Sequence, residues 1–368
     1  MTIEPLVSVV TPVYNGAAYL AECIESILAQ TYQNWRYTIV NNCSTDATLS
    51  IAEHYAALDD RIQIVNNVEF LDIIANANRA FRLISPLSKY CKNVSADDWL
   101  FPECLERMVA LAEAHPSVGL VGAYQLSGGG LDGRSWRVRW AEIPYPSQVT
   151  NGRDVCRCHL LGGPYFFGTP TSLLYRADLV RSHECFYPNS SAEADTSACY
   201  VCLRDTDFGF VHQVLSYERI HTAAISDTCR YLNSYESSRL SDLVTYGDWY
   251  LTKPERDKRL AEILANYYDF LGVSLFHFRT RDFWRYHAHR LAECGYPLSY
   301  RRLAWFGWTK AVDLVGNPKS TILKLLRLLG RPDKKTVYYT LFPAGAYTAP
   351  LHPAPAACET TARSLGAH

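Results

Sequence analysis

The chain has 368 residues, of which 48% are hydrophobic and 20% are charged, and these proportions exclude wholesale disorder. Lys and Arg total 36 against 37 Asp and Glu, which speaks against a dedicated nucleic-acid binder because such proteins carry a basic excess. At about 100–200 residues per domain, the length corresponds to one large domain with an appendage or to two domains.

Twelve cysteines are spread through the chain, and the first residues carry no basic signal-peptide segment. No run reaches the roughly 18 apolar residues of a membrane span. We therefore expect reduced thiols and a cytoplasmic protein. The Cys156/Cys158 and Cys199/Cys202 spacings also occur in zinc sites, but a simpler interpretation places Cys199 and Cys202 on one helix face as small apolar groups.

Strand-like and helical patterns alternate along the first part of the chain. Strands are predicted at 7–11, 36–40, 61–65 and 90–94, and helices around 20–28, 51–58, 74–84 and 102–112. This alternation predicts an α/β fold, with a mostly parallel sheet flanked by helices. Ligands of such sheets bind at the carboxyl ends of the strands. Polar residues lie at those ends, namely Tyr14-Asn15, Asn41-Asn42 and Asp97-Asp98.

The segment after the first strand distinguishes between classes of nucleotide-binding protein. It reads Thr11 to Gly16, without the G-x-G-x-x-G of dinucleotide-binding folds, and no P-loop motif occurs in the chain. A diphosphate would then be held through a divalent cation on carboxylates, for which adjacent Asp97 and Asp98 are suitable. The alternative for such a pair is a helix cap or a solvated turn.

Several segments, taken together and in order, resemble the family 2 glycosyltransferases over residues 5–225. They are Val7–Gly16, Asn41–Thr48, Asn76–Ala80, Ser95–Leu100, Gly168–Arg176, Glu193–Thr196 and Tyr217–His221. The resemblance implies a GT-A fold and an inverting glycosyltransferase that uses a nucleotide-diphosphate sugar donor and a divalent metal, Mg²⁺ or Mn²⁺. Its acceptor would be a glycan or a lipid-linked glycan in cell-surface polysaccharide assembly.

The resemblance also implies roles for individual residues. The nucleotide-binding residues are Pro12, Tyr14, Asn42 and Asp97, the metal ligands are Asp98 and His221, and the general base is Asp195. A carboxylate is the group needed to take the proton of an attacking hydroxyl. If Asp195 opens a helix, its alternative role is that of an N-cap, and the two roles are compatible.

Two positions depart from the family pattern. Ser95 stands where the carboxylate motif usually begins, and Asn41-Asn42 replaces the acidic pair of the base pocket. Because a carboxamide can both accept from N3–H and donate to O4 of uracil or thymine, we expect UDP or dTDP rather than GDP. These departures leave open a second interpretation, a non-catalytic nucleotide-sugar or glycan-binding subunit of an assembly complex. The presence of Asp98, Asp195 and His221 disfavours it.

The chain after residue 230 is predicted to be helical. We expect a glycosyltransferase domain at 1–230, a helical accessory region at 231–335 and a disordered tail at 336–368. Within 319–335, leucines share one helix face and basic residues share the opposite face. This amphipathic helix would lie either on the anionic inner face of the membrane or against protein with its basic face solvated.

Overall fold

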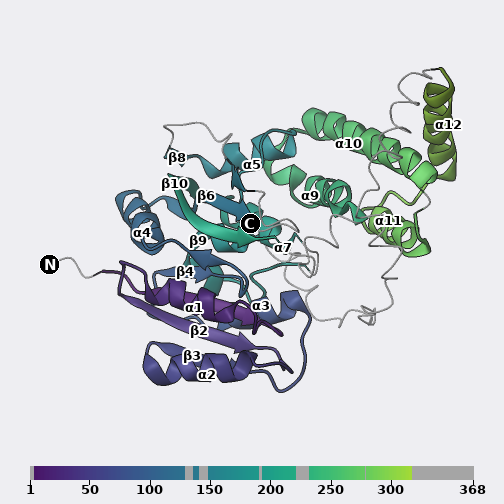
Figure 1. Ribbon diagram of the computed structural model, residues 1–368. Coiled ribbons are helices and arrows are strands. Elements are labelled where there is room, and N and C mark those ends of the chain that lie inside the picture. Colours follow the sequence, from purple (N-terminus) through teal and green to yellow (C-terminus); the bar gives the residue numbers. More distant parts are fainter. Residues whose placement is uncertain are drawn as a thin grey trace. The chain divides into compact units, whose positions relative to one another are not determined.

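A computed structural model describes residues 4–128, 136–140, 148–189, 193–220, 232–277 and 279–316 (Figure 1). The chain divides into two compact units, Met1–Leu264 and Ala265–His368. In the first unit, the helix Ser234–Tyr250 packs against the helix Gly152–Leu160. The predicted domain bounds of 1–230 and 231–335 stay a prediction.

Each strand and helix predicted between residues 7 and 112 is present. The strands are β1 (Val7–Val13), β2 (Trp35–Asn41), β3 (Ile62–Asn66), β4 (Tyr90–Asn93), β5 (Trp99–Leu100), β6 (Val118–Gly128), β7 (Arg137–Arg139), β8 (Val149–Thr150), β9 (Leu173–Arg176) and β10 (Asp207–Arg219). The helices begin with α1 (Leu20–Leu28), α2 (Thr48–Leu58), α3 (Ile73–Arg82), α4 (Cys104–Ala114), α5 (Gly152–Leu160), η1 (Pro170–Ser172), α6 (Ala177–Arg181), α7 (Ala194–Cys202) and α9 (Ser234–Tyr250). They continue with α10 (Lys253–Ser274), η2 (Leu275–His277), α11 (Arg281–Glu293) and α12 (Tyr300–Gly316).

The described strands form one sheet in the order β3-β2-β1-β4-β9-β6-β10-β5, with β7 beside β6 and β8 beside β10. The block β3-β2-β1-β4 is parallel, as predicted, and β6 and β10 are also parallel to each other. Strand β9 runs antiparallel to both β4 and β6, so the sheet is mixed beyond β4. The parallel block brings the carboxyl ends of β1, β2 and β4 to one edge of the sheet.

Helices cover both faces of this sheet (Figure 1). The chain moves in one direction from β1 to β2 to β3 and then returns past β1 to β4, so right-handed crossovers place α1 and α2 on one face and α3 on the other. Consistent with this, α1 packs against α2, and α3 packs against α6. The apolar stripe Leu20, Ile24 and Ile27 of α1 is fully buried. Cys199 and Cys202 are buried on α7, as the simpler interpretation of their spacing predicted.

A lysine lies inside this core. Lys92, in β4, is completely buried, and its Nζ lies 3.6 Å from the Sδ atom of Met108. Burial lowers the pKa of the Lys92 ammonium, because the charged form has lost its hydration. The folded chain therefore disfavours a charge that the unfolded chain carries at neutral pH.

We expect Lys92→Met to stabilise the protein by about 1–3 kcal/mol at pH 7, since the buried amine is replaced by an apolar chain of similar length. The gain should shrink as the pH approaches about 10.4, where the unfolded lysine also becomes neutral. Urea unfolding at pH 7 and pH 10 measures both values. Lys89→Met, at an exposed position that pairs with Glu113, serves as the control and should change stability by less than about 0.5 kcal/mol. A destabilised Lys92→Met protein at pH 7 would contradict this account.

The second unit is helical in its described residues. His287 is fully buried on α11, where its Nδ1 lies 2.7 Å from the hydroxyl of Tyr267, so it is a satisfied core histidine. Lys310 on α12 pairs with Asp269 on α10 at 2.6 Å. Among the described residues, no helix combines the length and the apolar character that crossing a bilayer requires. The helix predicted at 319–335 and the tail at 336–368 lie outside the described residues.

Candidate functional site

An exposed aromatic pair lies at the carboxyl end of β1. Tyr14 follows this strand and is 44% exposed, and Phe70, in the loop after β3, is 59% exposed. Their rings meet edge to face, with centroids 4.8 Å apart. Pro12, also predicted to line a base pocket, is half-buried in β1. Exposed rings at this position can stack on a nucleobase. Sequence reasoning missed Phe70 because it belongs to no periodic segment.

Asn42 follows β2 and is almost completely buried. Its Oδ1 accepts hydrogen bonds from Asn67 Nδ2 at 2.8 Å and from the backbone N–H of Leu71 at 2.9 Å. Its Nδ2 donates to the carbonyl oxygen of Leu71 at 2.8 Å. Asn42 thus holds the loop that carries Phe70, and reading a base would require it to give up one of these bonds. Its predicted contact with the base stays a prediction.

Asp97 and Asp98 follow β4 and differ in exposure. Asp97 is half-buried, whereas Asp98 is only 5% exposed. Asp98 Oδ2 accepts from the Thr171 hydroxyl at 2.6 Å, and Oδ1 accepts from the backbone N–H of Arg219 at 3.0 Å. Burial and the neighbouring charge of Asp97 raise the pKa of the Asp98 carboxyl well above its usual range. Asp98 therefore joins β4, η1 and β10 at a single point.

These two carboxylates fit a divalent cation. Hard oxygen ligands are the type that Mg²⁺ and Mn²⁺ prefer, and each Asp98 oxygen keeps a second lone pair beyond its one hydrogen bond. A cation would also relieve the repulsion between two adjacent negative charges. His221, the other predicted ligand, lies outside the described residues. Within the described part of the chain, no group of three His, Cys, Asp or Glu side chains could hold a metal.

Arg219, at the end of β10, contacts both α1 and the backbone of Asp97. Its guanidinium pairs with Glu22 on α1, and its Nε donates to the carbonyl oxygen of Asp97 at 3.2 Å. The same guanidinium lies 4.3 Å from the ring centroid of Tyr19 and 5.2 Å from that of Trp99. Arg219 thus fixes the backbone that presents Asp97. No local sequence signal assigns it this role, since its partners lie about 120 and 200 residues away along the chain.

Asp195 lies in the first turn of α7. Its Oδ1 accepts from the N–H of Thr196 at 2.8 Å, and the helix has no side-chain N-cap bond, so Asp195 does not act as the cap that sequence reasoning weighed. Desolvation by the surrounding protein raises the pKa of the Asp195 carboxyl to about 7. A carboxylate with this pKa can accept a proton efficiently near neutral pH. Neighbouring Glu193 accepts hydrogen bonds from Ser234 and Ser238 of α9.

One short segment connects Asp195 to Asp98. The hydroxyl of Tyr165 lies 2.7 Å from Thr196 Oγ1, beside Asp195, and it donates to the carbonyl oxygen of Gly168 at 3.1 Å. Three residues later, Thr171 donates to Asp98. The segment 165–171 therefore contacts Asp98 directly at one end and Thr196, the neighbour of Asp195, at the other. Sequence reasoning expected the sheet to bring the two carboxylates together, but it did not identify this segment.

Comparisons with known proteins identify a family and a fold. Residues 8–181 match the family described as Glycosyl transferase family 2. Bacillus subtilis (strain 168) EpsE, a protein named as a glycosyltransferase, is 36% identical over 157 residues, which cover 42% of this chain and 55% of EpsE. An uncharacterized glycosyltransferase of Haemophilus influenzae is 31% identical over 187 residues, or 50% of this chain and 55% of the relative. The chain thus spans about half the length of the curated relatives it matches.

The fold is also shared with solved structures. The crystal structure of S. aureus TarS 1-349 in complex with UDP-GlcNAc aligns with a TM-score of 0.56 at 18% identity, covering 78% of this chain and 80% of TarS. At this identity the likeness establishes the fold, which is the GT-A fold that the sequence predicted. The family match is confined to one part of the chain. Residues 8–181 form a glycosyl transferase family 2 domain.

Proposed function

We propose that this protein is a metal-assisted inverting glycosyltransferase that moves a sugar from a UDP- or dTDP-linked donor to a hydroxyl acceptor. The acceptor would be a glycan, free or lipid-linked, in cell-surface polysaccharide assembly at the inner face of the membrane. The observation that carries the proposal is that the segment 165–171 contacts both carboxylate sites. Thr171 donates to Asp98, and Tyr165 is hydrogen-bonded to Thr196, next to Asp195.

The donor would lie along the carboxyl ends of β1, β2 and β4. Its base would stack on Tyr14 and Phe70, whose exposed rings form one wall. The base would be uracil or thymine, since a carboxamide of Asn41 or Asn42 that gives up one of its present bonds could pair with N3–H and O4. Guanine would instead require an acceptor of two adjacent N–H groups. The fold is shared with TarS, solved with UDP-GlcNAc, which is consistent with a UDP-linked donor.

The reaction would be a single displacement. Asp195 takes the proton of the acceptor hydroxyl while that oxygen forms its bond to the anomeric carbon. The bond from the anomeric carbon to the diphosphate oxygen breaks on the opposite face, and the diphosphate leaves with the electron pair. A divalent cation on Asp98, with Asp97 beside it at the ribose or sugar, would supply the positive charge that stabilises this leaving group. The raised pKa of Asp195, about 7, favours this catalytic role over that of a non-catalytic binding subunit.

Calorimetric titration of the full chain with UDP, dTDP and GDP, each with and without Mn²⁺, tests the donor site. We expect UDP or dTDP to bind in a metal-dependent manner and GDP to bind at least about tenfold more weakly, a difference of about 1.4 kcal/mol. A folded protein that binds none of the three nucleotides would overturn the proposed function.

The aromatic pair gives a second prediction. Because stacking on an aromatic ring is worth about 1–3 kcal/mol per base, Phe70→Ala should weaken UDP binding by at least about fivefold. Val68→Ala is a matched control, since Val68 belongs to the same loop and is fully exposed without a ring. The same calorimetric titration measures both variants. Equal UDP affinity of Phe70→Ala and Val68→Ala would remove Phe70 from the base site.

A further inference from the structure

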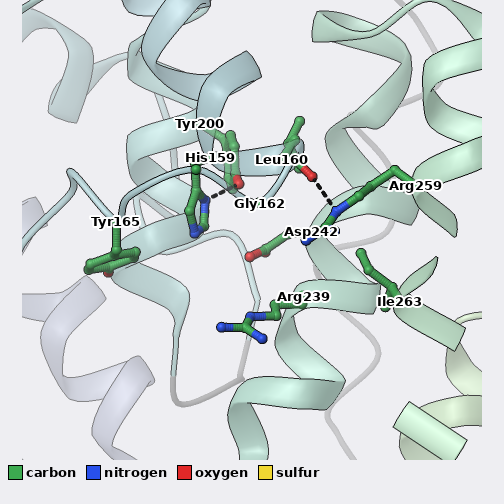
Figure 2. Close-up of a pocket in the computed structure, with 10 residues that line it drawn as sticks. His159, Leu160, Gly162, Tyr165, Tyr200, Arg239, Asp242, Arg259 and Ile263 are labelled. Carbon is green, nitrogen blue, oxygen red and sulfur yellow. Dashed lines mark hydrogen bonds between the residues drawn. The ribbon is translucent and has the colours of Figure 1, made fainter. Parts of the chain in front are cut away.

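A polar pocket that shares no lining residue with the proposed donor site includes Tyr165 in its wall (Figure 2). It has a volume of about 200 Å³ and is lined by residues of α5, α7, α9 and α10 together with the loop at Gly162–Tyr165. This volume is large enough to hold several waters or one sugar residue. No step of the donor chemistry described above uses it.

Two arginines supply positive charge to this pocket. Arg259 is fixed, because its Nε donates to the carbonyl oxygen of Leu160 at 3.0 Å and its guanidinium pairs with Glu262 at 3.1 Å. The side chain of Arg239 is 57% exposed, and the ion pair of its guanidinium with Glu236 spans 3.6 Å, which is longer than a hydrogen bond. Arg239 can therefore direct its donors toward a ligand, and Figure 2 shows it on the wall that faces His159.

The remaining polar groups suit hydroxyls. Asp242, one helical turn after Arg239 on α9, is only 7% exposed and lines the same pocket. On the opposite wall, His159 Nδ1 lies 2.6 Å from the Tyr200 hydroxyl. Burial and the charges of Arg239 and Arg259 lower the pKa of His159 to about 4, so the imidazole is neutral at physiological pH. A buried carboxylate and a neutral imidazole can bind sugar hydroxyls, whereas a simple anion would not need them.

The pocket is also connected to the proposed general base. Tyr165 forms part of its wall and is hydrogen-bonded to Thr196, whose N–H donates to Asp195. Its walls are held in place, because Tyr200 of α7 stacks on Tyr246 of α9 with ring centroids 4.8 Å apart. A group bound here would therefore lie next to the carboxylate that activates the acceptor.

We infer that this pocket binds an acidic sugar residue of the acceptor, with its acid group on Arg239 and its hydroxyls on Asp242 and His159. The inference rests on the proposed function, because it identifies the pocket as part of the acceptor site. A carboxylate and a phosphate present the same chemistry to a guanidinium, so the acid group could belong to a uronic acid or to a sugar phosphate.

The test uses the full chain with saturating UDP and Mg²⁺, which keeps phosphate probes away from the donor site. Methyl glucuronide, glucose 6-phosphate and neutral methyl glucoside are titrated while the His159 imidazole signal is followed by NMR. We expect at least one acidic probe to shift this signal and to bind at least tenfold more tightly than methyl glucoside. The acidic probe that binds more tightly shows whether the acid group of the natural ligand is a carboxylate or a phosphate.

Arg239→Gln should weaken binding of that acidic probe at least tenfold and leave the affinity for UDP unchanged. The matched control is Arg107→Gln, because Arg107 is also a helix-surface arginine, 46% exposed and paired with a glutamate one turn earlier. This control should bind every probe like the wild type. Equal binding of acidic and neutral probes, or an acidic probe that binds Arg239→Gln as tightly as wild type, would overturn the inference. Failure of the wild type to bind UDP would instead count against the proposed function.

Discussion

Asp195→Asn should reduce glycosyl transfer by about 10²–10⁴-fold while leaving UDP binding unchanged. The amide cannot accept the proton of the acceptor hydroxyl, and general-base catalysis contributes an effect of this size. Because the donor site lies at the opposite end of the segment 165–171, we expect the substitution to leave the affinity for UDP unchanged. Product formation by mass spectrometry and UDP titration by calorimetry measure the two quantities on the same sample.

The raised pKa of Asp195 predicts how both glycosyl transfer and stability change with pH. Asp195 must be ionised to act as a base, and its pKa is raised to about 7, so transfer should fall as the pH drops below 7. Stability should change in the opposite direction. The unfolded carboxyl has a pKa of about 3.9, so the folded state loses stability as the pH rises from about 4 through 7.

Asp195→Asn should therefore be more stable than wild type at pH 8, by at least about 1 kcal/mol or about 2–4 °C in Tm, and no more stable at pH 4. Asp178→Asn is a suitable control, because Asp178 is an exposed carboxylate. Its hydrogen bond and ion pair with Arg176 lower its pKa, whereas the pKa of Asp195 is raised. Undiminished transfer by Asp195→Asn would remove Asp195 from the mechanism, whatever its stability.

Asp98→Asn should abolish the metal dependence of UDP binding and lower the affinity at least about 100-fold, because a charged ligand of the cation is replaced by a neutral amide. The amide keeps an oxygen for the N–H of Arg219, so the corner joining β4, η1 and β10 should stay folded. Calorimetry with and without Mn²⁺ gives the affinity, and circular dichroism verifies the fold.

Thr171→Val separates the structural role of Asp98 from its proposed role as a metal ligand. This variant removes one hydrogen bond to the carboxylate but leaves its charge in place. We expect a loss of stability of about 1–2 kcal/mol with metal-dependent UDP binding retained. If Asp98→Asn bound UDP with Mn²⁺ as tightly as wild type, the cation would have to be assigned to Asp97 alone.

The sequence predicted the parallel block of the fold because hydrophobic period and turn residues are local signals. Val7–Val13 and Trp35–Asn41 are short β-branched or aromatic runs bounded by polar clusters, and both form central strands. The antiparallel insertion of β9 between β4 and β6 had no such signal, because it depends on pairing between segments about 50 to 85 residues apart.

The candidate site was predicted in part. Motif residues such as Tyr14, Asp98 and Asp195 occur at strand ends or helix starts, where a linear pattern can identify them. Phe70 could not be found in this way, since its role arises from a ring contact. Arg219 lies in the motif segment Tyr217–His221, but its bond to the backbone of Asp97 could not be predicted from that pattern. The buried bonds of Asn42 were equally invisible, because one-letter patterns do not show which side chains are already paired.

The most direct test of glycosyl transfer with Asp195 as the general base is the release of UDP from a panel of UDP-linked sugars, with a mixture of glycan acceptors and Mn²⁺. We expect metal-dependent UDP release from at least one donor by the wild-type protein, and a rate at least about 100-fold lower for Asp195→Asn. This expectation would be contradicted if the wild type and Asp195→Asn released UDP equally fast, or if the folded wild type turned over neither UDP- nor dTDP-linked sugars.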